Sequence, residues 1–220
     1  MTVRDKFEED LDELLERLDG EERVTRKLLV LRQKLVNMKR ENLVKSNHSL
    51  MELLCANSLI RADYEVEVEY KLSQTLVCDI FAIKGDGRLI VEVETGFVPP
   101  EHALDPNTYT AARIVSKISR YSPYADKFSL GVPPYVLLPV PRIFMKPPKD
   151  RSDSEISKFK ALCDLYYNSP PISENEIRNA RLHSICVIDV DRKEVDELNP
   201  EEYVEERPKW NLDSTSMLFD

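Results

Sequence analysis

Apolar residues recur at alternating intervals of three and four over the first 40 residues. One run consists of Phe7, Leu11, Leu14 and Leu18, and a second of Val24, Leu28, Leu31, Leu35 and Met38. This spacing places each run along one side of a helix, and Gly20 lies between the runs. The pattern predicts a helical hairpin arm over residues 1–45. Its apolar seam suits a short antiparallel coiled coil or a second copy of the chain.

A different period begins at Tyr64, where acidic and apolar residues alternate strictly as far as Lys71. Such alternation predicts a strand with one face in water. Two more apolar strands are predicted over residues 75–84 and 88–95. The segment Gly85-Asp86-Gly87 joins them, and Asp-Gly favours a hairpin because both central residues of a type I′ turn have positive φ.

The remaining pattern predicts further helices and strands around these three strands. Helices are expected at about residues 46–61, 107–121 and 155–167, and buried strands at 135–140 and 184–189. This order predicts an α/β domain over residues 46–190 behind the helical arm. The acidic residues 191–220 are expected to form an extended C-terminal arm.

The net charge of −9 excludes a protein coated in basic residues, but the charge is unevenly distributed. Residues 1–22 carry 3 basic and 10 acidic side chains, whereas residues 23–49 carry 8 basic and 1 acidic. The basic stripe, which includes Lys39 and Arg40, could grip a phosphate backbone. The alternative, slightly favoured because the two segments adjoin, is that it pairs with the acidic first helix.

No membrane-spanning segment is expected. The longest stretch without a charge covers residues 128–141 and is interrupted by prolines, whereas a spanning helix needs ~18 or more apolar residues. The charged N-terminus has no apolar core of a signal peptide. The four cysteines contain no C-x-x-C pair, which favours buried free thiols and a cytoplasmic location.

The most informative residues are three acids in the predicted hairpin. With Asp86-Gly87 as a two-residue turn, Asp79 would face Glu94 and Phe81 would face Glu92, so the three carboxylates share one face. Carboxylates so close together must share a proton or a cation.

Hard oxygen ligands suit Mg²⁺, with Mn²⁺ as a substitute, and a cation held there could activate water for attack on phosphorus. The alternative is three solvated carboxylates on an exposed sheet. The strongly apolar neighbours favour the cation site.

At these residues the chain resembles the PD-(D/E)xK nuclease superfamily, particularly its small Holliday-junction-resolvase-like members. That family places an acid on one strand and (D/E)-x-K on the next. The resemblance covers about residues 46–140 and implies a restriction-endonuclease-like α-β-β-β-α-β core with a central mixed sheet. It implies Asp79 and Glu92 as metal ligands, with the carbonyl of Val93 as a third. Glu94 stands where the family usually has Lys, as in some other members, which leaves open what supplies the positive charge.

Glu52 lies on the helix before the sheet, where similar nucleases often carry another metal-binding acid. The spacing from Ser49 to Glu52 also fits a capping box, so Glu52 could instead cap a helix start. The three histidines lie far apart, and His48 in particular is expected to be an ordinary histidine.

Arg113, Lys117 and Arg120 share one face of the helix predicted after the sheet. Lys117 could replace the lysine missing at position 94, while Arg113 and Arg120 could contact DNA. The alternative for all three is a solvated basic face.

Together these features predict a divalent-metal-dependent DNA endonuclease that uses Mg²⁺, with a branched or Holliday-junction substrate suggested by the resemblance. Its catalytic residues would be Asp79, Glu92, Glu94 and Lys117. A homodimer is expected because two strands need two cuts. The alternative is a catalytically inactive nuclease-fold protein that binds nucleic acid or serves as an assembly module.

Overall fold

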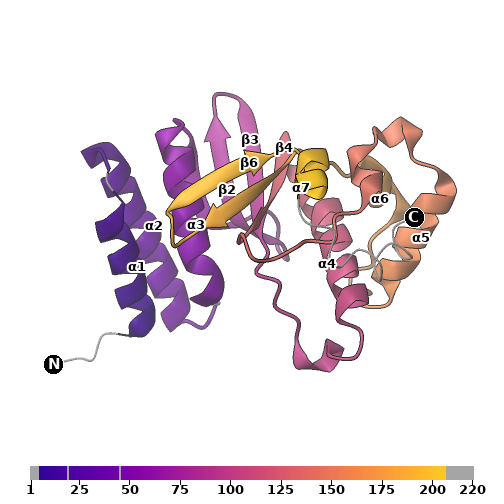
Figure 1. The fold of residues 1–220 in the computed structure, drawn as a ribbon, viewed down its shortest axis with the longest axis horizontal. Helices are drawn as coiled ribbons and strands as arrows, with labels where there is room; N and C mark the ends of the chain where they lie inside the picture. The colour runs from indigo at the N-terminus through magenta and orange to yellow at the C-terminus, as the bar shows by residue number, and fades with distance from the viewer. Residues whose placement is uncertain (1–4, 19, 45, 207–220) are drawn as a thin grey trace.

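A computed structural model describes residues 5–18, 20–44 and 46–206, and a six-stranded sheet forms its centre (Figure 1). The strands follow one another in chain order: β1 (Glu65–Lys71), β2 (Val77–Lys84), β3 (Gly87–Val93), β4 (Lys127–Val132), β5 (Ser184–Asp189) and β6 (Glu194–Leu198). Strands β1 to β3 are antiparallel, β3 to β5 are parallel, and β6 is antiparallel to β5. The chain is therefore an α/β protein with a mixed open sheet.

Helices cover both faces of this sheet (Figure 1). One layer contains α1 (Lys6–Arg17), α2 (Glu22–Arg40) and α3 (Ser46–Arg61), and the other contains α4 (Pro106–Tyr121), α5 (Asp153–Asp164) and α6 (Glu174–Asn179). Short 3₁₀ helices lie in the connections, at Pro100–His102, Ser122–Tyr124, Arg142–Met145 and Pro148–Asp150. Because Val91 packs with the first layer and Ile90 with the second, both faces of the sheet are buried.

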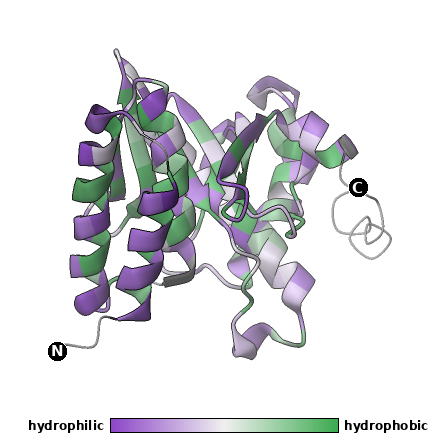
Figure 2. Cartoon of the chain, turned by 60° about the vertical axis from the view of Figure 1, so that its left-hand side comes forward, coloured by the Kyte–Doolittle hydropathy of each residue, from purple (hydrophilic) through white to green (hydrophobic). Residues whose placement is uncertain are grey.

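The N-terminal helices pack onto the sheet instead of projecting as an arm. Their apolar seam residues, such as Leu11 and Leu28, belong to the same core as Val91 of β3. Figure 2 shows how hydrophobic and hydrophilic residues share each of these helices. The seam is buried within one chain, so it is not an exposed surface for a second copy.

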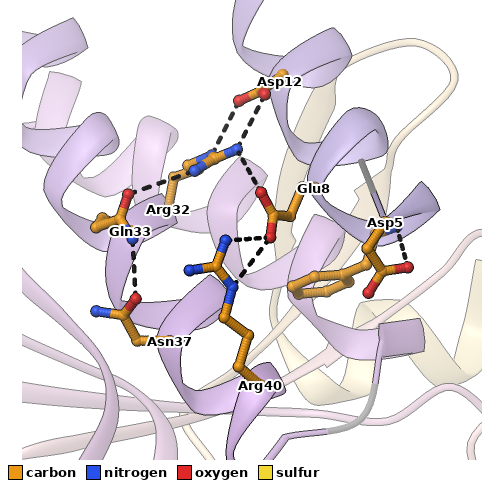
Figure 3. A network of polar contacts seen from close by, with 8 residues as sticks. Asp5, Glu8, Asp12, Arg32, Gln33, Asn37 and Arg40 are labelled. Atoms are coloured by element: carbon orange, nitrogen blue, oxygen red, sulfur yellow. Dashed lines mark hydrogen bonds and ion pairs between the residues drawn. The ribbon is translucent and has the colours of Figure 1, made fainter. Parts of the chain in front are cut away.

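The basic stripe of α2 pairs with acids of this chain (Figure 3). Arg32 donates to both carboxylate oxygens of Asp12 at 2.9 Å, and Arg40 donates to Glu8 at 2.6 Å. Lys39 lies over the ring of Phe7, with Nζ 5.7 Å from the ring centre. Arg32 and Arg40 therefore pair with the acidic first helix. Lys27 and Lys34, in contrast, pair with acids of β1.

The prediction of a strand over residues 135–140 is wrong. The fourth strand lies instead at Lys127–Val132. Prolines at 133, 134, 139 and 141 lack the N–H that a central strand must donate. The sequence pattern did not reveal the strand at Lys127–Val132, because Ser129 and Gly131 interrupt its run of apolar residues. A Cβ at Gly131 would lie 2.8 Å from the terminal methyl of Ile188, which would have to shift.

The hairpin register differs from the prediction by two residues. Lys84 pairs with Gly87, so the turn is Gly85–Asp86, and Phe81 faces Ile90 instead of Glu92. Gly85 has φ of +59°, which glycine adopts without strain. A shift by two residues leaves every side chain on its predicted face, so the three carboxylates still point the same way.

Residues 194–206 form structure where an extended arm was expected. Strand β6 pairs with β5, and α7 (Pro200–Glu206) follows it. Tyr203 is only 1 % exposed, because its ring joins the core and its hydroxyl accepts a hydrogen bond from the Leu138 amide at 3.1 Å. Residues 207–220 of the predicted arm lie outside the described residues.

All four cysteines are buried and free, which confirms the predicted thiols. Within the described ranges, none of the helices combines the length and the apolar character that crossing a bilayer requires.

Candidate functional site

The pairing of β2 with β3 ends near the carboxyl end of β3. Beyond that point, carboxylate side chains accept hydrogen bonds from the backbone amides of the two strands. The Val93 amide donates to Asp79 Oδ2 at 2.6 Å, and the Asp79 amide donates to Glu92 Oε1 at 3.0 Å. Beside β3 runs the parallel strand β4, and ligands often bind outside the carboxyl ends of such strands. The backbone therefore fixes two acidic side chains at a favourable position for a site.

Lys117 of α4 lies among the three predicted carboxylates. Its Nζ atom is 3.6 Å from Asp79 Oδ2, 3.0 Å from Glu92 Oε2 and 2.8 Å from Glu94 Oε1. The same ammonium donates to the carbonyl oxygen of Val93 at 3.1 Å. Burial disfavours its charge, but the three carboxylates outweigh burial and raise the pKa of Lys117 well above its ordinary value. The lysine thus stays charged at neutral pH.

The side chain of Glu92 is 1 % exposed, and here burial prevails and favours the uncharged form of the carboxyl group. Loss of water, reinforced by the charge of Asp79, raises the pKa of Glu92 to about 8. Glu94 is similarly buried and forms an ion pair with Arg113 as well as with Lys117. Arg113 also donates to the carbonyl of Phe97 at 2.7 Å, which ties the loop after β3 to α4.

Helix α3 brings Glu52 and His48 to the same place from the opposite helical layer. Glu52 is fully buried, and neither of its carboxylate oxygens has a hydrogen-bond partner. Burial and the neighbouring acids, Asp79 first among them, raise the pKa of Glu52 well above its ordinary value. Because α3 begins at Ser46, Ser49 is not its cap, and the capping interpretation of Glu52 is wrong.

His48, Glu52 and Asp79 form a set that could hold a metal ion. Each offers one ligand atom, and these atoms lie within 4.8 Å of one another. Sequence reasoning missed His48, although it lies four residues before Glu52 and therefore on the same helical face. Burial lowers the pKa of His48, so its imidazole is neutral and able to bind a metal.

The other two predicted ligands are less available. Glu92 Oε1 accepts the Asp79 amide and Oε2 lies against Lys117, while the carbonyl of Val93 accepts a hydrogen bond from Lys117. The buried carboxylate of Glu52, by contrast, makes no hydrogen bond, which is costly unless the group is protonated or binds a cation. The residues therefore fit a divalent cation.

A fifth acid, Glu69 of β1, was missed because its strand was interpreted as having one face in water. Its backbone has φ of +47°, which breaks the regular alternation of the strand. Burial and the charge of Asp79 raise the pKa of Glu69 to about 7.

The residues predicted to bind DNA lie on two separate helices, α4 and α2. Arg113 and Arg120 lie on α4 beside the acidic cluster, and Arg120 donates to the carbonyl of Pro170 at 2.6 Å. Lys39 and Arg40 lie on α2, where they contact α1, and they are not part of this cluster.

Comparisons of the chain with models of protein families, with curated proteins and with solved structures found no match.

Proposed function

We propose that the protein is a divalent-metal-dependent DNA endonuclease with the restriction-endonuclease-like fold of the PD-(D/E)xK superfamily. The order α3, β1, β2, β3, α4, β4 supports this, because it matches the α-β-β-β-α-β core that the resemblance implies. Asp79 lies on β2 and Glu92 on β3, as the motif requires. The observation that carries the proposal is the buried, unpartnered carboxylate of Glu52 beside Asp79 and His48.

His48, Glu52 and Asp79 would hold the cation, and Glu92 would contribute if Lys117 moved away from it. When bound, Mg²⁺ or Mn²⁺ would offset the negative charge that develops on the phosphate. The imidazole of His48 makes Mn²⁺ a better fit than Mg²⁺, which prefers oxygen ligands.

Lys117 would supply the positive charge that position 94 lacks. It reaches the cluster from α4 instead of from β3, and three carboxylates hold it charged. An ammonium fixed in a site of low exposure can stabilise charge on a phosphate oxygen more than it could in water. Glu94 positions it, since Glu94 binds both Lys117 and Arg113.

The glutamate at position 94 also favours a second candidate. A nuclease-fold protein without the usual lysine could bind nucleic acid without cutting it, provided that Lys117 only neutralises the carboxylates.

Cleavage assays with Mg²⁺ or Mn²⁺ test the proposal on duplex, single-stranded and four-way-junction DNA. The wild-type protein should cut at least one of these. Asp79→Asn and Lys117→Met should each lower the rate by a factor of about 100 or more. Asp126→Asn is the matched control, because Asp126 lies just before β4 and pairs there with Arg88.

Cleavage that is lost in Asp79→Asn and kept in Asp126→Asn would support the endonuclease. Binding without cleavage by the wild-type protein would favour the second candidate, and neither binding nor cleavage would refute both. Measuring the molar mass of the protein in solution, with and without junction DNA, tests the proposed homodimer.

A further inference from the structure

A pocket of about 320 Å³ opens directly beside the acidic cluster. It shares Lys117 and His48 with that cluster, but its other lining residues take no part in the proposed metal site. Its volume is at the lower end of the range for ligand sites, so it suits one compact group.

Basic side chains line one side of this pocket. Arg113, Lys117 and Arg120 come from one face of α4. Arg113 and Arg120 are each anchored by a backbone carbonyl, of Phe97 and Pro170 respectively. Fixed guanidinium groups of this kind bind phosphate well, because they lose little freedom on binding.

Aromatic side chains also line it, namely Phe97, Tyr109, Tyr121 and Tyr167, together with a few small or apolar residues such as Ser116 and Leu76. Phe97 is 50 % exposed and follows Gly96, which has φ of +76° and lies against Val136. Tyr109 is held by a stacked His102, with ring centres 4.0 Å apart. The stacking with His102 therefore fixes the ring of Tyr109, and the hydrogen bond from Arg113 fixes the backbone at Phe97.

The lining residues include no Asp or Glu. Glu94 pairs with Lys117 and Arg113 from the side of the sheet, whereas the side chains that line the pocket are mainly basic and aromatic. Cations together with flat aromatic faces are the chemistry that binds a nucleotide, since the phosphate pairs with the cations and the base stacks on the rings.

A paired base cannot use such a pocket, because both of its faces are covered by its neighbours in the duplex. We propose that the pocket receives one unpaired nucleotide of a DNA strand, with its base on Phe97 and its phosphate toward Lys117. The inference rests on the proposed function and narrows its substrate to single strands, flaps or frayed ends. An intact, fully paired four-way junction would be a poor substrate.

Binding can be tested separately from cleavage, with Ca²⁺ as the hard cation. Fluorescence anisotropy would compare a labelled oligothymidylate with a blunt duplex of the same length. The wild-type protein should bind the single strand more tightly. A plot of the logarithm of the association constant against the logarithm of the salt concentration should have a slope no steeper than about −2. At most three basic side chains of the pocket would contact phosphates.

Phe97→Ala should weaken single-strand binding by about tenfold or more, and Phe97→Trp should restore it. Tyr135→Ala is the matched control, because Tyr135 is 83 % exposed and does not line the pocket. Equal affinity for duplex and single strand, or no loss of affinity in Phe97→Ala, would overturn the inference.

The two proposals fail in different ways. Single-strand binding that depends on Phe97, without cleavage in Mg²⁺ or Mn²⁺, would refute the endonuclease and support the pocket. Cleavage that depends on Asp79 but proceeds equally on duplex and single strand would support the endonuclease and refute the pocket.

Discussion

Glu52 is the residue whose surroundings are hardest to explain without a ligand. A buried carboxyl that donates or accepts no hydrogen bond costs the fold free energy, and its neighbours Asp79 and Glu92 add repulsion. A cation would remove both costs at once. Without one, the carboxyl takes up a proton, as its raised pKa indicates.

Replacing Glu52 with methionine should therefore stabilise the metal-free protein. The free energy of unfolding should rise by about 1–3 kcal/mol, because the substitution removes an unsatisfied polar group. At the same time the gain in stability on adding Mn²⁺ should shrink. Denaturant unfolding in EDTA and in Mn²⁺ measures both effects.

Glu67→Met is the control for that substitution, because Glu67 is exposed and pairs with Lys34 at the surface. It should change stability by less than about 1 kcal/mol under both conditions. Destabilisation by Glu52→Met in EDTA would show that the carboxyl has a structural partner after all.

The raised pKa values of Glu69 and Glu92, about 7 and about 8, predict how stability changes with pH. Both acids ionise near 4.5 in the unfolded chain, so the folded state holds more protons and loses stability as pH rises through these values. In EDTA, stability should therefore fall between pH 6.5 and 8. The histidines with lowered pKa act in the opposite direction, but only below about pH 6.5.

Unfolding curves at several pH values in that window provide the measurement. Glu69→Gln should flatten the profile, because it removes one of the acids whose pKa is raised in the folded protein. A wild-type profile that rises from pH 6.5 to 8 would contradict the assigned protonation.

At the scale of elements, the site depends on where α3 and α4 meet the end of β3. Alternation along the strands was enough to predict that Asp79, Glu92 and Glu94 share a face. The helical period placed Lys117 with Arg113 and Arg120. These inferences needed only local geometry, which survives a register error of two residues.

Other features could not be predicted because they depend on contacts distant in sequence. His48 and Glu69 join the cluster only through the packing of α3 and β1 against the sheet. The pattern of β4 is interrupted by small residues that pack closely against neighbouring strands, such as Gly131 against Ile188. The N-terminal seam is apolar whether its partner is a second chain or the sheet of the same chain.

The contact between α1 and α2 gives a test of the N-terminal layer. Arg32 has a side chain only 14 % exposed and binds Asp12 through two parallel hydrogen bonds (Figure 3). A double-mutant cycle with Arg32→Met and Asp12→Asn should give a coupling energy of about 1 kcal/mol, above that of an exposed pair. The exposed pair of Arg26 and Glu22 is the comparison, and equal coupling in both pairs would contradict a structural role for Arg32.

For the whole molecule, the distribution of charge restricts the proposed binding of DNA to one part of the surface. The net charge is −9, and the basic stripe of α2 is paired with acids of the same chain. The basic groups beside the site belong to α4. We therefore expect DNA to contact only the surface around α4, and the affinity to depend weakly on salt concentration because few phosphates are contacted.

The central claim is that the acidic cluster holds a divalent cation, and anomalous diffraction from Mn²⁺-soaked crystals tests it most directly. We expect an anomalous peak within coordination distance of Glu52, Asp79 and His48. No peak in the cluster at saturating Mn²⁺, with both Glu52 oxygens still unpartnered, would contradict it.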